Sequence, residues 1–252
     1  MEVEKQEIHV RTGPRAGQVM LVSTPNAGAA WRVKTMFTKE PDTIAWLSSM
    51  KAGEVFLDVG ANIGLYSLYA ALHGLTVYAF EPHAQNYAQL VQNIQLNNLS
   101  DQVKAYCAAL TDETYSWGTL YVSDRKAAGS LHNFGEKKNF RKEASEFKDS
   151  QGCFATAMDD LPWNFDHIKI DVDGIEEKVI RGGDRKLGLA KSVLVEINHN
   201  LPEHRDVLET MYSMGFQTDE AQIKAAKRTE GSFANVGNVI FTKPAKAMEA
   251  AA

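Results

Sequence analysis

Several features that would indicate a specialised class of protein are scarce in this sequence. It has two cysteines in 252 residues, Cys107 and Cys153, without the short spacing typical of a zinc site. We expect both thiols to be buried. There is no run of about 18 apolar residues that would predict a membrane-spanning helix, and residues 1–10 lack the apolar stretch of a signal peptide. These absences favour a cytoplasmic protein that acts away from membranes.

An excess of positive charge is also missing. Lysine and arginine number 27 against 32 aspartates and glutamates, which gives a formal net charge of -5 at pH 7. Such a chain has no general attraction to phosphate backbones, so nucleic acid is not an expected partner. The composition, 44% hydrophobic and 23% charged, is that of one large globular domain with a buried core.

From residue 54 onward, short apolar runs alternate with amphipathic stretches. This alternation is typical of an α/β fold, in which a mostly parallel sheet carries helices on both faces. Strands are predicted at residues 55–57, 76–80, 103–106, 168–170 and 192–196. Helices, recognised by apolar residues three and four positions apart, are predicted at residues 65–72, 85–96, 176–180 and 203–214. A closing antiparallel strand pair, joined by a polar loop, is predicted at residues 216–218 and 239–242.

The segments around this alternating core differ in composition. Residues 1–50 are expected to form a cover, a β-hairpin followed by a helix that begins at Pro41, within the same domain as residues 51–243. Residues 123–151 are strongly polar and interrupt the alternation. We expect them to be either a mobile surface loop or a lid over a substrate. Residues 244–252 are expected to be a C-terminal tail.

A glycine turn follows the first strand of the alternating core. Its sequence is Asp58-Val59-Gly60-Ala61-Asn62-Ile63-Gly64, and a helix is predicted directly after it. Gly60 would let the main chain approach a ligand closely, and Gly64 would let the helix pack tightly on the strand. In a dinucleotide-binding turn, G-x-G-x-x-G, a glycine stands where this chain has Asp58. Because that carboxylate would repel a pyrophosphate but attract an ammonium group, the turn disfavours NAD.

Three further residues are expected to contact an adenosine-containing cofactor. Glu81 ends the second strand, where a carboxylate can accept hydrogen bonds from two ribose hydroxyls, although alone it would equally suit the start of a helix. Ala108, after the third strand, is expected to line the apolar slot that adenine requires. Asn62 is expected either to contact the amino-acid end of the cofactor or to bond to its own turn.

Four segments carry a likeness to a known family. They are the glycine turn with its strand, Phe80-Glu81-Pro82, Ala108-Ala109-Leu110-Thr111-Asp112, and above all Ile168-Lys169-Ile170-Asp171-Val172-Asp173-Gly174-Ile175-Glu176 followed by Val179-Ile180-Arg181-Gly182-Gly183. From about Val55 to Thr242 the chain resembles the FkbM family of S-adenosylmethionine-dependent methyltransferases. Asp173 departs from the family, in which glutamate usually precedes this glycine, so its carboxylate has a shorter reach.

The resemblance has consequences for fold, cofactor and reaction. It implies a Rossmann-like sheet of seven strands with S-adenosylmethionine as the cofactor. It also implies transfer of a methyl group, typically to a hydroxyl of a sugar or a natural product. The acceptor is not identified by the resemblance, because family members differ mostly in the covers and loops that form the acceptor pocket.

Methylation of a neutral hydroxyl requires an aligned acceptor and a base. Candidate bases follow the fourth and fifth strands, whose carboxyl ends lie beside the glycine turn in a sheet of this kind. The catalytic candidates are Asp171, Glu196 and His199, with Asp173, Glu176 and His132 as further possibilities. Structural roles are the alternative: Asp171 as the partner of Lys169, which needs a carboxylate inside its apolar strand, and the two histidines as loop or surface residues.

Other functions remain open from the sequence. Asp171 and Glu196, with Asn198 nearby, would suit Mg²⁺, but a metal is not favoured and none is assigned. An N-methyltransferase acting on an amine or protein side chain, and a cofactor-binding scaffold without catalysis, are alternatives to O-methylation of a small molecule. A nicotinamide-dependent dehydrogenase is disfavoured by Asp58 and by the glycine spacing. The oligomeric state is not predicted.

Overall fold

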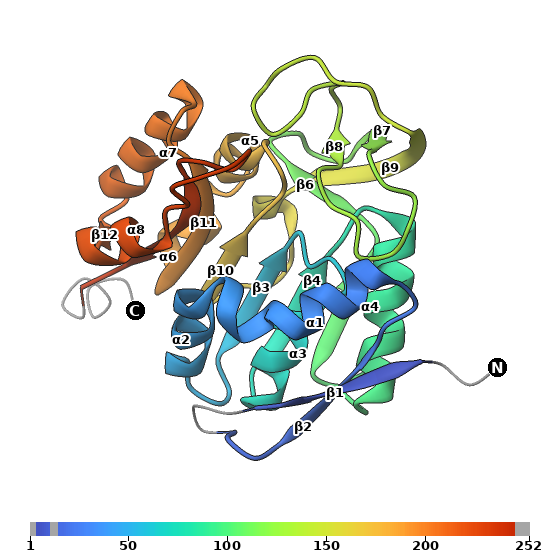
Figure 1. Cartoon of the computed structure of the whole chain (residues 1–252). Helices are drawn as coiled ribbons and strands as arrows, with labels where there is room; N and C mark the ends of the chain where they lie inside the picture. Colours follow the sequence, from blue (N-terminus) through green and yellow to red (C-terminus); the bar gives the residue numbers. More distant parts are fainter. Residues whose placement is uncertain (1–3, 11–14, 245–252) are drawn as a thin grey trace.

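A seven-stranded sheet forms the centre of the computed structural model (Figure 1), which describes residues 4–10 and 15–244 and so excludes nearly all of the predicted tail. The strand order is β12-β13-β11-β10-β3-β4-β5. These strands are β3 (Val55–Val59), β4 (Thr76–Phe80), β5 (Val103–Tyr106), β10 (His167–Ile170), β11 (Ser192–Asn198), β12 (Gln217–Thr218) and β13 (Val236–Thr242). β13 runs antiparallel to both of its neighbours, β11 and β12, and the other neighbouring strands of this sheet are parallel. The predicted α/β fold is confirmed.

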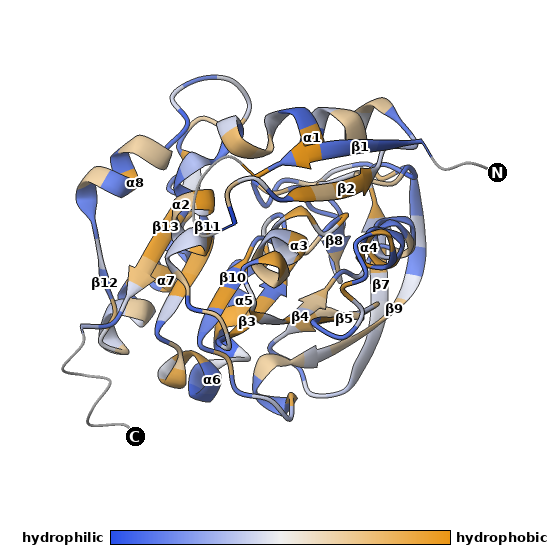
Figure 2. Ribbon diagram, turned by 90° about the horizontal axis from the view of Figure 1, so that it is seen from below, coloured by the Kyte–Doolittle hydropathy of each residue, from blue (hydrophilic) through white to orange (hydrophobic). Residues whose placement is uncertain are grey.

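Both faces of the sheet are covered by helices, because successive residues of each strand point to opposite sides. Phe56 and Val77 pack into a core with α2 (Pro41–Ser49), α3 (Leu65–Leu72) and α4 (Ala84–Leu96). Leu57 and Ile168 pack into a second core with α5 (Glu176–Arg181), α6 (Asp184–Leu189) and α7 (Pro202–Ser213). Figure 2 shows the apolar strands enclosed between these layers. The predicted helices therefore lie where the strand periodicity requires them.

The N-terminal cover contains one helix more than the sequence predicts. The expected hairpin is present as β1 (Lys5–His9) paired antiparallel with β2 (Val19–Ser23). Between it and α2 lies α1 (Ala27–Lys39), whose first turn is capped by the Asn26 side chain. The buried residues of α1, Ala29, Val33 and Met36, have helical spacing. A signal for this helix was therefore present in the sequence.

A second, four-stranded sheet lies beside the main one and was not predicted (Figure 1). Its order is β6-β9-β7-β8, formed by β6 (Ala109–Thr111), β7 (Ser116–Val122), β8 (Asn133–Phe134) and β9 (Asp149–Ala157). The polar segment 123–151 connects β7 to β9 and contains β8, so its last three residues belong to a strand. Much of β7 and β9 is partly or fully exposed, which weakens the apolar signal that identifies strands.

Two smaller expectations are corrected. The connection between β12 and β13 is not only a polar loop, because it contains α8 (Glu220–Ala226), capped by Asp219. Of the two cysteines, Cys153 is buried but Cys107 is exposed. No helix of the described ranges has the length and apolar character needed to cross a bilayer.

The packing of Gly60 predicts a large effect of a single methyl group. Gly60 has a φ of +81°, and a Cβ there would lie 1.9 Å from the carbonyl oxygen of Asp171. We expect Gly60→Ala to lower the free energy of unfolding by at least about 2 kcal/mol, from left-handed strain and displacement of β10. Urea denaturation measures this effect. The matched control is Gly152→Ala, which has no neighbour within 4 Å and no positive φ; equal stability of the two variants would contradict this account.

Candidate active site

The site lies where the strand order of the main sheet changes direction. The chain passes from β3 to β4 and β5 on one side and then crosses to β10 and β11 on the other, an arrangement in which ligands bind between the diverging strands. A cavity of about 420 Å³ opens there, a volume typical of small-molecule sites. Its wall includes Gly60, Asn62, Glu81, Ala108, Asp171 and Glu196 from the predicted site. The other predicted residues, Asp58, Gly64 and His199, do not line it.

Glycine residues in the turn after β3 permit close packing at two points. The position of Gly60 against the Asp171 carbonyl brings the turn directly onto the end of β10. A Cβ at Gly64 would lie 2.3 Å from Leu90 Cδ1. Gly64 was expected to let α3 pack tightly on the strand. Instead, the missing side chain leaves room for Leu90 of α4.

Asp58 does not face the cavity. It lies on the same side of β3 as Phe56, beneath α3, and its Oδ2 accepts a hydrogen bond from Ser67 Oγ at 2.6 Å. Its Oδ1 lies 3.7 Å from Lys169 Nζ. The predicted contact with a cofactor ammonium group is not supported by this position. The alternation of side chains along the strand explains the error, because Asp58 must share a face with Phe56.

Lys169 is paired with carboxylates, as expected from its apolar strand. Its Nζ donates to Asp171 Oδ2 at 3.0 Å, and its side chain is almost fully buried. Burial raises the pKa of Asp171, but the Lys169 ammonium outweighs it and holds that pKa below its usual value. Asp171 is therefore ionised at neutral pH, and it lines the cavity.

Asp171, Asp173 and Glu196 form a cluster of carboxyl groups at the cavity wall. Each contributes an oxygen atom within 4.8 Å of the others. Burial, and then the charge of Asp171, raises the pKa of Asp173 to about 7. The same two causes hold the pKa of Glu196 well above its usual value, although Arg228 donates to it at 3.2 Å. One full negative charge, on Asp171, thus remains beside two carboxyl groups that tend to keep their protons.

The loop that carries Asp173 is held by Glu176. Asp173 and Gly174 have φ values of +59° and +115°, which a loop keeps only when its surroundings support it. The Glu176 carboxylate accepts hydrogen bonds from the N–H groups of Val172 and Gly174 at 3.1 Å. Glu176 is 1% exposed and does not line the cavity, so its predicted role as a base is corrected to a structural one.

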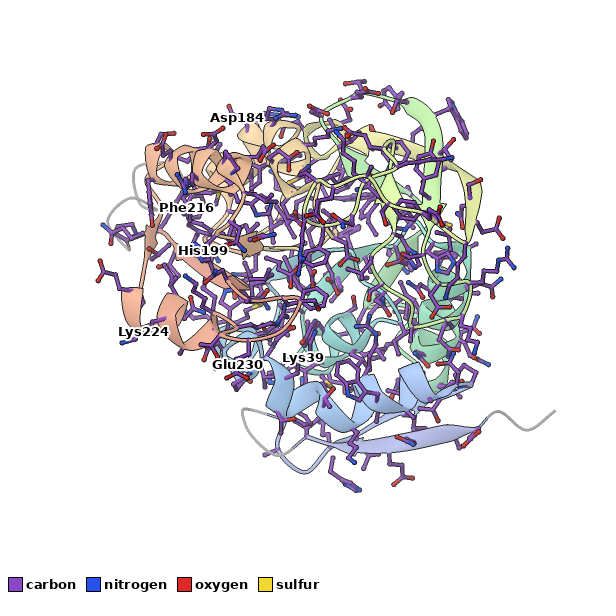
Figure 3. The ribbon with its side chains drawn as sticks, turned by 45° about the horizontal axis from the view of Figure 1, so that its top comes forward. Lys39, Asp184, His199, Phe216, Lys224 and Glu230 are labelled. Atoms are coloured by element: carbon purple, nitrogen blue, oxygen red, sulfur yellow. The ribbon has the colours of Figure 1, made fainter. Side chains whose placement is uncertain are left out.

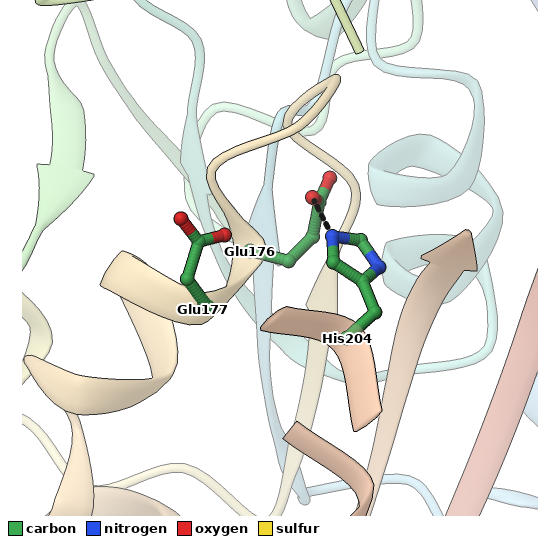
Figure 4. Close-up of side chains that lie close together, drawn as sticks. All are labelled: Glu176, Glu177 and His204. Atoms are coloured by element: carbon green, nitrogen blue, oxygen red, sulfur yellow. Dashed lines mark ion pairs between the residues drawn. The ribbon is translucent and has the colours of Figure 1, made fainter. Parts of the chain in front are cut away.

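His204 of α7 supports Glu176 in turn (Figure 4). Its Nε2 lies 3.3 Å from Glu176 Oε2, while its Nδ1 accepts a hydrogen bond from the Asn198 N–H at 2.9 Å. Because Nδ1 accepts, a neutral ring carries its proton on Nε2, which faces Glu176 without forming a hydrogen bond. Glu177 completes this buried group and accepts from Lys142 Nζ at 2.8 Å.

Glu81 is a buried carboxyl group in the cavity wall. Its Oε2 accepts from the Asn62 N–H at 2.8 Å, and its Oε1 accepts from the His83 N–H at 2.9 Å. Burial nevertheless raises its pKa to about 7. Because His83 directly precedes α4, Glu81 supports the start of this helix and also lines the cavity.

Part of the polar segment 123–151 closes over this cavity. The Gly129 carbonyl accepts hydrogen bonds from Asn62 Nδ2 at 2.7 Å and from Asn86 Nδ2 at 3.1 Å. The Leu131 N–H donates to Asp173 Oδ2 at 2.6 Å. Asp173, which is shorter than the glutamate usual in the family, therefore contacts this segment. Because Gly129 also lines the cavity, this part of the segment has the position expected of a lid. Asn62 uses its amide nitrogen for this segment, while its Oδ1 accepts a hydrogen bond from the Ile63 N–H of its own turn at 2.9 Å, as the local interpretation predicted.

The two histidine candidates have different positions. His132 lines the cavity and is 8% exposed, so it is not a surface residue. Its Nδ1 accepts from the Ser123 N–H at 3.2 Å, and burial lowers its pKa to about 4. His199, at the end of β11, lies on the side of the C-terminal elements, away from Lys39 at the end of α1 (Figure 3). The structure does not bring His199 to the cavity.

Most residues around this cavity belong to a segment that matches a known family. Residues 58–218 match the methyltransferase FkbM domain, which is more than half of the chain. The chain belongs to the FkbM methyltransferase domain family. This assignment rests on the whole segment from β3 to β12, including the glycine turn and the carboxyl cluster.

Two curated methyltransferases share part of the chain. The 31-O-demethyl-FK506 methyltransferase FkbM of Streptomyces tacrolimicus is 29% identical over 150 residues, covering 56% of this chain and 55% of its own length. Methyltransferase sdnD of Sordaria araneosa is 27% identical over 179 residues, covering 60% of this chain and 68% of its own. The match therefore spans about half the length of the first relative.

A solved structure shows the same fold. Magnesium protoporphyrin IX methyltransferase from Synechocystis PCC 6803, determined with bound SAM, superposes with a TM-score of 0.52. The similarity covers 88% of this chain and 86% of that one, at 12% sequence identity. At this identity the likeness concerns the Rossmann-like methyltransferase fold alone.

Several cavity residues were not predicted, and the most informative lie outside the FkbM match. Trp31, Arg32 and Lys39 come from α1, while Arg228 and Phe233 come from the connection before β13. The Asn26 cap and the apolar spacing of α1 would have predicted the helix but not its contact with the cavity. That contact depends on how the cover packs on the sheet, which no local pattern encodes.

The raised pKa of Glu81 predicts a pH dependence of stability. Since its folded-state pKa of about 7 exceeds its usual value of 4.5, the folded protein binds this proton more tightly, and the resulting stability is present below pH 4.5. It is lost as the pH rises through 7, by about 3 kcal/mol. Glu81→Gln should show correspondingly less decline between pH 5 and pH 8 in urea denaturation, whereas the exposed control Glu113→Gln should follow the wild type. Identical pH profiles for all three proteins would contradict this assignment.

Proposed function

We propose that this protein is an S-adenosylmethionine-dependent methyltransferase that methylates a hydroxyl group on a sugar or another natural-product small molecule. The observation that carries the proposal is one cavity that combines a buried carboxyl group at Glu81 with an ionised carboxylate at Asp171. The first suits the ribose of an adenosine, and the second suits the proton of an acceptor hydroxyl.

The residues present fit the cofactor. Ala108, Leu110 and Phe134 give one part of the cavity an apolar lining suited to adenine. Glu81, whose two oxygens already orient the turn and the start of α4, would accept from the ribose hydroxyls. The His132 Nε2 has no hydrogen-bond partner among the described residues, so it could donate a hydrogen bond to a ligand in the cavity. When bound, S-adenosylmethionine supplies a methyl carbon on a positively charged sulfur.

Asp171 is the residue that we assign as the base. It would take the proton of the acceptor hydroxyl as the oxygen bonds to the methyl carbon and the carbon–sulfur bond breaks. Lys169 keeps it ionised and oriented. Glu196 and Asp173 would hydrogen-bond the acceptor as neutral carboxyl groups. His199 is not retained as a catalytic residue, since it does not reach the cavity.

A magnesium ion is not part of the proposal. The oxygens of Asp171, Asp173 and Glu196 are of the type that Mg²⁺ prefers. However, Lys169 donates to Asp171 and Arg228 donates to Glu196, so cationic side chains already occupy two members of the cluster. A divalent cation would have to compete with both.

Oxygen is favoured over nitrogen as the methylated atom. The relative from Streptomyces tacrolimicus is named as acting on a 31-O-demethyl compound, and a neutral hydroxyl needs the base that Asp171 provides. A nitrogen acceptor remains the second candidate, because carboxyl groups at the cavity would also bind an amine. Incubation of hydroxylated metabolites, sugars and amines with methyl-labelled S-adenosylmethionine, followed by mass spectrometry, separates the two. Labelled amines alone, or no labelled product, would contradict the proposal.

Removal of the base should abolish turnover without removing the cofactor. With the acceptor found in that screen, we expect Asp171→Asn to lower kcat by at least about 100-fold, because an amide cannot take the hydroxyl proton. Affinity for S-adenosylhomocysteine, measured by calorimetry, should remain within about threefold of the wild type. Glu196→Gln should reduce kcat less than Asp171→Asn does.

Two controls accompany that comparison. Asp112→Asn removes a carboxylate that pairs with Arg181 away from the cavity, and kcat should be unchanged. EDTA should also leave turnover unchanged. Full activity of Asp171→Asn would show that Asp171 has only a structural role, and loss of activity in EDTA would show that a metal ion takes part.

A further inference from the structure

Glu40, at the junction of α1 and α2, is a carboxylate that accepts hydrogen bonds from four side chains. Its side chain is 11% exposed. Its Oε1 accepts from Lys39 Nζ at 2.8 Å and from Arg228 Nη2 at 3.2 Å. Its Oε2 accepts from Tyr66 Oη at 2.9 Å and from Asn238 Nδ2 at 3.0 Å. Burial raises the pKa of Glu40, but the Lys39 ammonium outweighs it and holds that pKa below its usual value. Glu40 is therefore ionised at neutral pH.

Arg228 connects Glu40 to the active-site cavity. Its Nη2 donates to Glu40 Oε1, while its Nη1 donates to Glu196 Oε1 at 3.2 Å. Arg228 and Glu196 line the cavity, whereas Glu40 does not. Figure 3 shows Lys39, at the end of α1, on the same side of the molecule as Glu230, which belongs to the connection that carries Arg228. The guanidinium group is thus divided between two carboxyl groups.

This division leaves one oxygen of Glu196 without a partner. Glu196 Oε1 accepts from Arg228, and its Oε2 makes no hydrogen bond with any described residue. A guanidinium that faces a single carboxylate prefers a two-pronged pair, in which both oxygens of the carboxylate accept. Glu40 opposes that pair, because it binds the second nitrogen of the fork. Glu196 Oε2 therefore remains available to a ligand.

We propose that Glu40 is a positioning residue for the methyl acceptor, which holds Arg228 on one oxygen of Glu196 and so leaves the other oxygen for the acceptor. This inference rests on the proposed function, in which Glu196 hydrogen-bonds the acceptor. Glu40 precedes the FkbM match at residues 58–218. The N-terminal cover thereby contributes to the acceptor site through Arg228.

The same contact affects the proton of Glu196. The charged groups that face Glu196 come from the loop after β10, from α5, from the connection before β13 and, across the cavity, from α1: Asp171, Asp173, Glu176, Arg228, Lys39 and Arg32. Burial, and then Asp171, raises the pKa of Glu196, whereas Arg228 lowers it. A two-pronged pair with Arg228 would lower that pKa further, because both nitrogens of the fork would then face one carboxylate. Loss of Glu40 should therefore remove both the free oxygen and the proton of Glu196.

Kinetics with the acceptor found in the screen tests this role. We expect Glu40→Gln to raise the KM of the acceptor about 10-fold, the effect of one lost hydrogen bond. Its kcat and its affinity for S-adenosylhomocysteine should remain within about threefold of the wild type. Glu40→Asp should restore part of the loss, because it keeps the charge with a shorter reach. In an Arg228→Met background, Glu40→Gln should change the KM by less than about twofold, since Glu40 acts through Arg228.

A control variant separates this role from a role in anchoring the cover. Tyr66→Phe removes one hydrogen bond to Glu40 Oε2 and leaves Arg228 on Oε1. The KM of the acceptor should then equal that of the wild type. Thermal unfolding shows whether each variant is folded. An equal rise of the KM in Tyr66→Phe and Glu40→Gln would contradict the proposal, because weaker anchoring of the cover would explain both.

A titration that needs no turnover tests the link between Glu40 and Glu196. NMR of protein labelled at the carboxyl carbons of glutamate gives the titration midpoint of Glu196, whose signal is assigned by its absence in Glu196→Gln. We expect the midpoint to lie at lower pH in Glu40→Gln than in the wild type. Either an unchanged midpoint or an unchanged KM would overturn the inference and leave the proposed function standing. If the wild type transfers no methyl group, the proposed function fails, whereas the titration shows separately whether Glu40 acts on Glu196 through Arg228.

Discussion

The buried ammonium group of Lys169 is the interaction on which the rest of the site depends. It lies between Asp58 and Asp171 at the adjacent ends of β3 and β10. An unpaired charge at this depth would be very costly, so the lysine and the two carboxyl groups stabilise one another. The pairing removes Asp58 from the cavity and fixes Asp171 at its wall in the ionised form. Gly60 completes the arrangement, because only a residue without a side chain lets the turn lie against the Asp171 carbonyl.

Burial and neighbouring charges, more than residue type, decide which carboxyl groups of the cavity are ionised. Asp171 is ionised because Lys169 touches it, whereas the pKa values of Asp173, Glu196 and Glu81 are raised. Asp171 is thereby available to take a proton, beside Asp173 and Glu196, which act as neutral hydrogen-bonding partners.

The sequence predicted the central sheet because its strands and helices differ in apolar period and are separated by glycine turns. It also predicted that Asp171 and Glu196 would meet, since both follow strands with a common carboxyl edge. It was wrong about Asp58, whose direction follows from the alternation along β3, and about Glu176 and His199, whose directions depend on loop and helix packing. The second sheet and α1 were missed, because half-exposed strands give a weak pattern and the cover's contact with the cavity is long-range. FkbM membership, inferred from local motifs, is confirmed.

The most direct test of the account is the pH dependence of S-adenosylhomocysteine binding. If the ribose hydroxyls bind the ionised form of Glu81, whose pKa is about 7, binding must release a proton at neutral pH. Affinity measured by calorimetry should then rise about tenfold between pH 6 and pH 8. Buffers with different ionisation enthalpies should report the released proton. An affinity that is independent of pH, or no binding at either pH, would contradict the placement of the cofactor in this cavity.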